Sequence, residues 1–371
     1  MGIGEPSGHA ASAGCSSCYG LADRAAPHDT ERRGTPMIGK YVGRLSDDDP
    51  LHGFLTRVAR DRLGVRGHDD SYRVFRLSGS HEVYCYEGRS TSTRIIGKFF
   101  GPRFGSDRDR AARMASREYD SMQRLRGYGL RGSPHHVVRP LAVDHEINCV
   151  LVMEHYEGEQ FSQAIDRALA GDDGHLFWRL RALAYYLATQ HNRTANGATV
   201  DFTADCTYLH QLLGVLRERG RIGQWDVDEL SWLCGMWRER PRMWQDRQVW
   251  LHGDATPANF LFGHGLDVAA IDLERCKRGD RMFDVGRVAG ELQHAFLSAT
   301  GDWRRAEPFI GHFLWEYSCH FPDRDATFRS VSSRLPYYMA LNLLRVARND
   351  YISRDYGGKL VHRAKTLLRS C

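Results

Sequence analysis

The sequence contains no apolar run close to the length of about 18 residues that a membrane-spanning helix needs. It also lacks, at its N-terminus, the basic segment followed by an apolar segment that marks a secretory signal. Both absences argue against a membrane protein or a secreted one. We therefore expect no membrane span.

Cysteines at metal-ligand spacing are also scarce. The nine cysteines are widely scattered, and only Cys15 and Cys18 form a CxxC pair. A structural zinc site would need a second pair, or two histidines at ligand spacing, and neither lies nearby. An odd number of cysteines without a secretory signal favours reduced thiols, and hence a cytoplasmic location.

The charge balance shows no excess that would indicate a nucleic-acid partner. The formal net charge is only +5 over 371 residues, and no basic stripe with interleaved aromatic residues occurs. An apolar content of 42% and a charged content of 26% are typical of a globular protein. A chain of this length can bury a full core, and two lobes are the natural expectation. The composition leaves the oligomeric state open.

Three segments differ in their patterning. Residues 1–36 are rich in Gly, Ala, Ser and charged residues without periodicity, and we predict a flexible leader there. Residues 37–154 predict an N-terminal lobe of antiparallel strands with one main helix. Residues 155–371 predict a mainly helical C-terminal lobe, so the expected fold class is α+β.

Local periodicity supports this division. Short alternating or apolar runs predict strands at 72–77, 82–86, 94–100, 137–143 and 149–154. Apolar residues at helical spacing predict helices at 107–126, 205–219, 226–240, 286–298, 303–320, 335–350 and 358–369, with Asp226 as the N-cap of the third.

Polar residues that suit a metal-and-phosphate site are concentrated at residues 248–291. Asp254 follows a strand-like run, on a tight turn that Gly253 allows, and Asn259 comes five residues later. A second apolar run ends at Asp272. Phosphoryl transfer needs a carboxylate that orients or deprotonates the acceptor, and oxygen ligands that hold Mg²⁺. We therefore expect Asp254 to serve the acceptor, while Asn259 and Asp272 serve the metal.

The predicted N-terminal lobe supplies the remaining parts of such a site. Lys98 lies on the third predicted strand and can contact phosphates as a point charge, while Glu118, 20 residues later on a helix, can hold it in place. The turn Ser78-Gly79-Ser80 can expose backbone N–H groups to a phosphate.

The run HGDATPANFLF followed by AAIDLE resembles the aminoglycoside phosphotransferase family, also called the choline-kinase-like phosphotransferase family. The family pattern is His-Gly-Asp, four residues, Asn, and then an apolar strand ending in Ile-Asp-x-Glu. The order of elements agrees over about residues 54–350, but only residues 250–287 carry specific motifs. The resemblance implies a two-lobed protein-kinase-like fold and an ATP-dependent transfer of phosphate to a small-molecule hydroxyl, with Mg²⁺ as cofactor.

The resemblance also implies a role for each matching residue. It makes Asp254 the catalytic base, Asn259 and Asp272 the Mg²⁺ ligands, and Glu274 a contributor to a second metal or its surrounding network. The other implied roles are structural bracing by His252 and Asp284, phosphate binding by Lys98 paired with Glu118, phosphate cover by the Ser78-Gly79-Ser80 turn, and adenine binding through a hinge at Glu154 to Tyr156.

The acceptor is constrained only by charge. Basic residues outnumber acidic ones over residues 291–371, and Arg345 and Arg348 share one helical face. This argues against a polycationic aminoglycoside and favours a neutral or anionic acceptor, unless both arginines are simply solvated. Two other interpretations remain open: an atypical Ser/Thr protein kinase and a catalytically silent ATP-binding scaffold. The short interval between Asp272 and Asp284, without an evident activation segment, speaks against the former.

Overall fold

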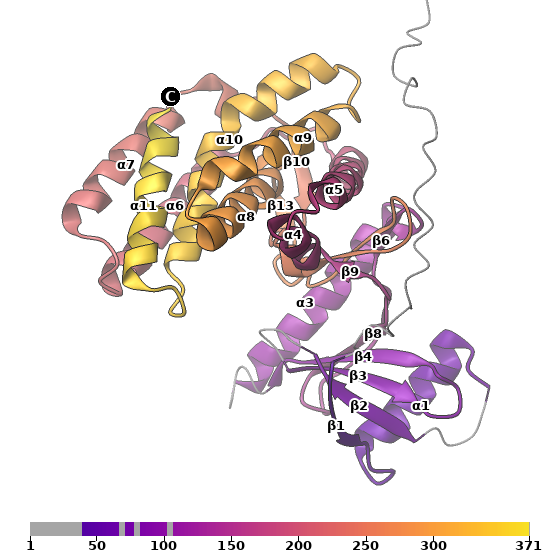
Figure 1. The fold of residues 1–371 in the computed structure, drawn as a ribbon. Coiled ribbons are helices and arrows are strands. Elements are labelled where there is room, and N and C mark those ends of the chain that lie inside the picture. Colours follow the sequence, from indigo (N-terminus) through magenta and orange to yellow (C-terminus); the bar gives the residue numbers. More distant parts are fainter. Residues whose placement is uncertain (1–38, 67–70, 78–81, 102–106, 371) are drawn as a thin grey trace, which may run out of the picture. The chain divides into compact units, whose positions relative to one another are not determined.

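The N-terminal half of the molecule is built on a six-stranded sheet (Figure 1). The computed structural model describes residues 39–66, 71–77, 82–101 and 107–370. All neighbouring strands of the sheet are antiparallel. In spatial order they are β1 (Lys40–Arg44), β2 (Tyr72–Arg76), β3 (Glu82–Gly88), β4 (Arg94–Phe99), β8 (Val150–Glu154) and β7 (Pro140–Asp144). The five predicted strands are all present. The edge strand β1 was missed because its largely exposed residues show no apolar alternation.

Two helices cover the two faces of this sheet. Helix α1 (Pro50–Leu63) begins at Asp49, whose side chain accepts a hydrogen bond from the Leu51 amide. Helix α3 (Arg108–Gly127) packs on the other face. Successive residues of β4 point to opposite faces of the sheet: Ile95 packs in the apolar cluster around α1, and Ile96 packs in the cluster around α3. The same alternation turns Lys98 toward α3.

Two small sheets complete the strand content, and the larger of them joins the two halves of the chain. One contains β5 (Arg131–Gly132), β6 (His135–Val137), β12 (Val268–Ala270), β11 (Phe260–Phe262) and β9 (Glu159–Gln160), in that order. The other pairs β10 (Gln248–Leu251) with β13 (Lys277–Asp280). Strand β6 lies parallel to β12, so a segment of the predicted N-terminal lobe pairs with one of the predicted C-terminal lobe. Residues 38–371 cluster as one compact unit, and the lobe boundary at residue 154 stays a prediction.

Helices form most of the C-terminal half. They are α4 (Phe161–Leu169), α5 (Asp173–Thr194), α6 (Phe202–Glu218), α7 (Gln224–Arg238), α8 (Met282–Thr300), α9 (Glu307–Ser318), α10 (Arg324–Ala347) and α11 (Arg354–Arg369). Their apolar faces share one core with β10, β11 and β12. Among the described residues, no helix is both long and apolar enough to cross a membrane. The predicted leader at 1–36 lies outside the described residues.

Several helix starts differ from the prediction, and two of them are instructive. Helix α7 begins after Gly223, and Asp226 is its third residue; the Asp226 carboxylate accepts a hydrogen bond from the Gly223 amide at 2.9 Å. Asp226 is therefore not the N-cap. Helix α10 begins at Arg324, well before the predicted start at residue 335, and continues through Pro336.

Candidate active site

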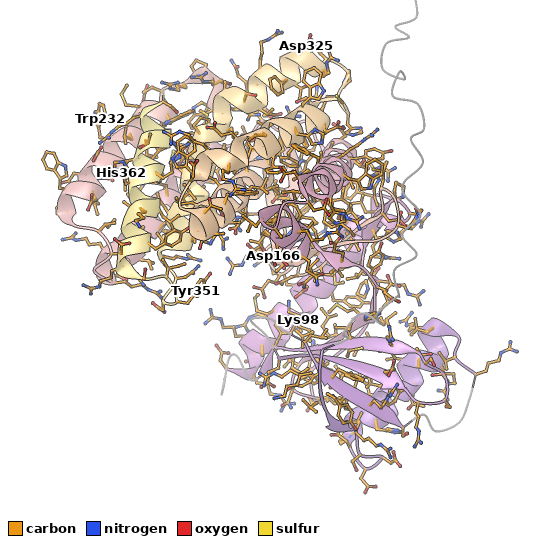
Figure 2. All side chains as sticks on the ribbon, viewed as in Figure 1. Lys98, Asp166, Trp232, Asp325, Tyr351 and His362 are labelled. Carbon is orange, nitrogen blue, oxygen red and sulfur yellow. The ribbon has the colours of Figure 1, made fainter. Side chains whose placement is uncertain are left out.

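Strand β4 and helix α3 bring Lys98 and Glu118 into contact. Lys98, labelled in Figure 2, places its Nζ atom 2.7 Å from Glu118 Oε2 and 2.8 Å from Asp272 Oδ1. Glu274 Oε2 lies 3.9 Å from the same nitrogen. Both Lys98 and Glu118 are buried. Residues separated by more than 170 positions in the sequence thus share one buried ion-pair network.

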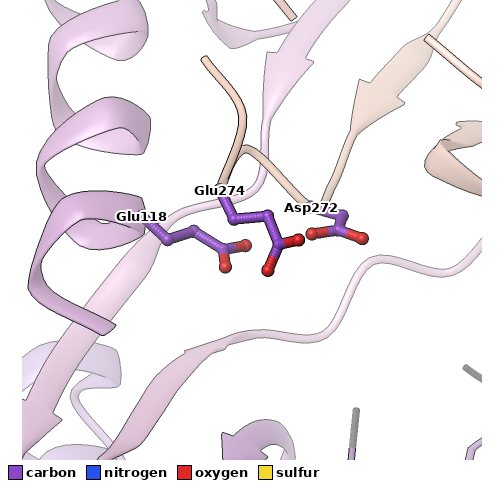
Figure 3. Close-up of side chains that lie close together, drawn as sticks. All are labelled: Glu118, Asp272 and Glu274. Carbon is purple, nitrogen blue, oxygen red and sulfur yellow. The ribbon is translucent and has the colours of Figure 1, made fainter. Parts of the chain in front are cut away.

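Three carboxylates surround this single ammonium group. Figure 3 shows the side chains of Glu118, Asp272 and Glu274 directed toward one another. One oxygen from each lies within 4.8 Å of the others. Burial opposes the charge on Lys98, but the carboxylates of Glu118 and Asp272 raise its pKa above the ordinary value. Lys98 therefore remains an ammonium ion.

The same cluster suits a hard cation. Burial raises the pKa of Glu118, against the opposing effect of Lys98. The Oε1 atom of Glu118 is buried and has no hydrogen-bond partner among the described residues. An all-oxygen donor set with excess negative charge is what Mg²⁺ prefers. Glu118, predicted only as the partner of Lys98, is thus also part of the acidic cluster.

Asn259 lies beside the acidic cluster through its backbone. It ends the short 3₁₀ helix η3 (Pro257–Asn259), and its carbonyl accepts a hydrogen bond from the Ile271 amide at 3.1 Å. Its side-chain nitrogen donates to the Asp254 carbonyl at 2.8 Å. Because the nitrogen is used in this way, the side-chain oxygen is the atom suited to a metal. Asp272 follows with a φ of +61°, a left-handed conformation that Asp tolerates better than most residues.

Asp284 holds the turn that precedes Asp254. It lies in the first turn of α8, and its two carboxylate oxygens accept the His252 amide at 2.7 Å and the Gly253 amide at 2.9 Å. Gly253 has a φ of +80°, and a Cβ atom there would lie 2.1 Å from the Arg275 carbonyl oxygen. Only glycine satisfies both conditions.

The His252 ring connects the Asp254 turn with the Asp272 turn. Its Nε2 atom lies 3.0 Å from the Ile271 carbonyl oxygen, which can only accept, so Nε2 carries the proton. Its Nδ1 accepts from the Asp254 amide at 3.3 Å. The ring is completely buried. These contacts are those of a neutral histidine that braces the loop. His191, which sequence reasoning did not single out, contacts Asp284 at 3.4 Å as a further partner.

Three arginines surround the Asp254 carboxylate. Arg287 donates to Oδ1 at 2.5 Å and also to the Gly253 carbonyl at 3.1 Å. Arg275 lies 3.6 Å from Oδ2, and Arg345 lies 4.0 Å from Oδ1. Burial opposes ionisation, but Arg287, Arg345 and Arg275 lower the pKa of Asp254 below its ordinary value. Asp254 is therefore ionised at neutral pH.

Of these arginines, the sequence singled out only Arg345. Arg287 stands three residues after Asp284 on α8, so helical spacing puts both on the side of the loop. That spacing was the signal that could have identified Arg287. Arg275 follows Glu274 in the turn before β13, and no local pattern marks it.

Of the residues predicted to contact the nucleotide, the structure describes Glu154 and Tyr156 but not the 78–80 segment. Ser78, Gly79 and Ser80 lie outside the described residues. The Glu154 carboxylate accepts the Arg139 amide at 2.7 Å, so its side chain holds the start of β7 to the end of β8. The Tyr156 ring packs against His136 at a centroid distance of 5.3 Å. An adenine contact at 154–156 would therefore involve the backbone, and it stays a prediction.

Known structures share this architecture. The amicoumacin kinase hAmiN is 15% identical in sequence and has a TM-score of 0.55. The alignment covers 86% of this chain and 96% of the amicoumacin kinase chain. An ethanolamine kinase from Plasmodium vivax is 12% identical, with a TM-score of 0.54 over 87% of this chain and 89% of the kinase chain. Choline kinase LicA from Streptococcus pneumoniae is 17% identical, with a TM-score of 0.50 over 87% of this chain and 100% of the LicA chain. At such identities the likeness establishes the fold, which is protein-kinase-like.

Sequence comparison establishes the family. No curated protein shows significant sequence similarity to this chain. The model of the phosphotransferase enzyme family, however, matches residues 76–313, which is more than half of the chain and includes both Lys98 and the Asp254 loop. The predicted family resemblance and fold class are thereby confirmed. The chain belongs to the phosphotransferase enzyme family, and it is a phosphotransferase of protein-kinase-like fold.

Proposed function

We propose that this protein is a small-molecule kinase that transfers the γ-phosphate of ATP to a hydroxyl group. The observation that carries the proposal is the contact of Lys98 with Asp272, at 2.8 Å, in a member of this family. It joins a cation suited to phosphates with a carboxylate suited to a metal. The neighbouring amicoumacin kinase structure is a complex with AMP-PNP and Ca²⁺, which supports ATP as the donor and a divalent cation as cofactor.

On the nucleotide side, Lys98 binds the phosphates and Glu118 keeps its ammonium group in position. Asp272, Asn259 and Glu274 would hold Mg²⁺, and the carboxylate oxygens of Asp272 and Glu274 in the acidic cluster suit that ion. Bound Mg²⁺ would offset the negative charge that develops on the transferring phosphate. The backbone of residues 154–156 binds adenine, while the predicted phosphate cover by Ser78, Gly79 and Ser80 lies outside the described residues.

On the acceptor side, Asp254 orients the attacking hydroxyl and receives its proton. The acceptor oxygen forms a bond to the γ-phosphorus while the bond from that phosphorus to the β–γ bridging oxygen breaks. A carboxylate whose pKa is lowered by arginines is a weak base. Asp254 therefore contributes mainly by orientation, and it takes the proton late, when the hydroxyl has become acidic. His252 and Asp284 keep the Asp254 turn rigid.

The two alternatives receive less support. After Asp272 the chain enters β13 and then α8 directly, so this stretch offers no activation segment on which a peptide substrate could lie. That favours a small-molecule acceptor over a protein. A silent ATP-binding scaffold would have no need of a hydrogen-bonded, ionised Asp254 beside an acidic cluster. A cytoplasmic location stays a prediction.

Turnover of ATP by wild type and by Asp254→Asn, with Mg²⁺ and a mixture of hydroxyl compounds, tests the proposal. Wild type should add one phosphate to an acceptor, as detected by mass spectrometry. Asp254→Asn should lower kcat by roughly 10²- to 10⁴-fold while still binding ATP. The exposed Asp166 on α4 provides the control variant Asp166→Asn. If wild type and Asp254→Asn give the same phosphate transfer, the proposed role of Asp254 is wrong.

A further inference from the structure

Five cationic side chains gather around the acceptor side of the site. Three of them, Arg275, Arg287 and Arg345, lie within 4.0 Å of the Asp254 carboxylate. The other two are Lys277 on β13 and Arg348 after α10. All five are placed by elements of the C-terminal half. These five cations differ in whether a carboxylate of the protein neutralises them.

Two of the five are fully engaged. Arg287 is bound by Asp254 and by the Gly253 carbonyl, and its side chain is almost completely buried. Arg345 donates to Glu291 at 2.5 Å and to the Asn342 side chain at 3.1 Å. These two arginines are therefore held by the fold, and their positions are set before any ligand binds.

Two others form no ion pair within the described residues, although the Asp205 carboxylate interacts electrostatically with Lys277 at longer range. Within the described parts of the chain, no carboxylate oxygen lies within 4.0 Å of the cationic group of Arg348 or Lys277. The Lys277 ammonium lies over the Phe283 ring at 4.2 Å and the Tyr208 ring at 6.0 Å. Arg348 is half-buried. Burial lowers the pKa of Arg348, and the neighbouring guanidinium groups of Arg345 and Arg275 lower it further.

These two cations lie close to the arginines that contact Asp254, since Lys277 and Arg287 both lie over the Phe283 ring, at 4.2 Å and 4.9 Å. Arg348 neighbours Arg345 and Arg275, which approach Asp254 to 4.0 Å and 3.6 Å. Tyr208 of α6 links the two groups, because it lies near Lys277 and interacts electrostatically with Arg348. The half-buried guanidinium of Arg348 is repelled by those of Arg345 and Arg275, and an anion would relieve that repulsion.

We infer that the acceptor carries an anionic group, a phosphate ester or a carboxylate, which Arg348 and Lys277 bind while its hydroxyl faces Asp254. This inference rests on the proposed phosphotransfer at Asp254 and names the class of its acceptor. The planar guanidinium of Arg348 can donate two parallel hydrogen bonds to such an anion. An acceptor with several positive charges would instead face the same unbalanced cations, and like charges would oppose its binding.

Matched acceptors test the inference. We would compare glycerol with glycerol 3-phosphate and ribose with ribose 5-phosphate, and include choline and gentamicin as cationic acceptors. Wild type should show a higher kcat/KM for the phosphorylated member of each pair. Arg348→Gln should reduce the ratio of the two kcat/KM values by roughly 10- to 100-fold, because a hydrogen bond between charged groups is lost. The exposed Arg329 on the same helix gives the control Arg329→Gln, which should leave the ratio unchanged.

A binding measurement makes the test independent of turnover. Inorganic phosphate would be titrated calorimetrically into the full chain saturated with AMP-PNP, so that the nucleotide site is filled. Wild type should bind phosphate more tightly than Arg348→Gln. Equal binding by both proteins, or an unchanged acceptor ratio in Arg348→Gln, would overturn the inference.

The two levels of the proposal fail in different ways. If choline or gentamicin is the better acceptor and transfer depends on Asp254, the anionic acceptor is wrong and the kinase activity stands. If no compound gains a phosphate and Asp254→Asn leaves ATP turnover unchanged, the proposed function is wrong and the inference falls with it.

Discussion

The two ends of the candidate active site have opposite charge imbalances. Around Lys98, three carboxylates surround one ammonium group. Around Asp254, three guanidinium groups lie within 4.0 Å of one carboxylate, but Arg345 also pairs with Glu291 and Arg275 also lies 3.6 Å from Glu274. The excess positive charge at this end comes from Arg348 and Lys277, which form no ion pair within the described residues. Buried charge without a counter-charge is costly. The imbalance at each end therefore indicates the missing ligand: a cation beside Asp272 and an anion beside Arg348 and Lys277.

The comparison also separates rigid parts from adaptable ones. Glu118 is completely buried, whereas Asp272 is 25% exposed. Similarly, Arg287 is only 4% exposed, whereas Arg275 is 41% exposed. At each end one buried ionic contact fixes the geometry, while a second charged group, Asp272 or Arg275, remains accessible.

The largest expected effect comes from removing charge at the acidic end. Asp272→Asn should lower kcat by about a thousandfold, because several kcal/mol of metal-assisted stabilisation is lost. The rise in melting temperature produced by Mg²⁺ together with AMP-PNP should also disappear. Asp166→Asn, on the surface of α4 (Figure 2), should behave as wild type. Turnover near the wild-type level at saturating Mg²⁺ would show that Asp272 is not a metal ligand.

The next effect concerns stability at the same end. Lys98→Met leaves Glu118 buried without its cation, and breaking a buried ion pair in this way costs roughly 3–5 kcal/mol. Urea unfolding without nucleotide measures this cost. The double variant Lys98→Met with Glu118→Gln should recover part of the lost stability, because no unpaired charge remains buried. A double variant as unstable as the single one would show that the lost stability has another cause.

A smaller effect should follow at the turn that carries Asp254. Asp284→Asn keeps only one oxygen acceptor for the amides of His252 and Gly253, so one charge-assisted hydrogen bond worth about 1.5–3 kcal/mol is lost. The unfolding free energy should fall by that amount. The value of kcat should fall as well, since Asp254 loses its fixed position. Stability that falls while kcat is unchanged would mean that the turn is held by other contacts.

The smallest effect concerns a buried carboxylate whose hydrogen-bond partner is neutral. The Asp205 carboxylate contacts the Tyr338 hydroxyl at 2.9 Å, and burial together with Asp280 raises its pKa to about 7. The folded state therefore binds a proton that the unfolded state has released. Stability from this group is present at low pH and is lost as the pH rises from about 4 toward about 7. Asp205→Asn should remove this loss.

Unfolding of wild type and Asp205→Asn, compared at about pH 5 and about pH 7, measures the difference. Wild type should lose up to about 1.4 kcal/mol more per pH unit than the variant, which is the value for one proton. An identical pH dependence in the two proteins would mean that ionisation of Asp205 does not lower the free energy of unfolding.

Much of the site followed from the sequence because its signals are local. The run from His252 to Asn259 places an aspartate, a permissive glycine and an amide on one short loop, and Asp272 ends the next apolar run. The alternation along β4 and the helical spacing of α3 were readable, so the approach of Lys98 to Glu118 could be expected. The short strands β5, β6, β9 and β11 could not be, because two or three residues carry no periodicity.

The sequence by itself determined which chemical groups are available and on which elements they stand. Only the tertiary structure decided which of them meet. Glu118 joins the acidic cluster because β4 carries Lys98 toward Asp272, and Arg287 reaches Asp254 because Asp284 ties α8 to the loop. Charge balance is a property of groups that converge in space from distant positions. No local pattern could therefore show that one end of the site has excess negative charge and the other excess positive charge.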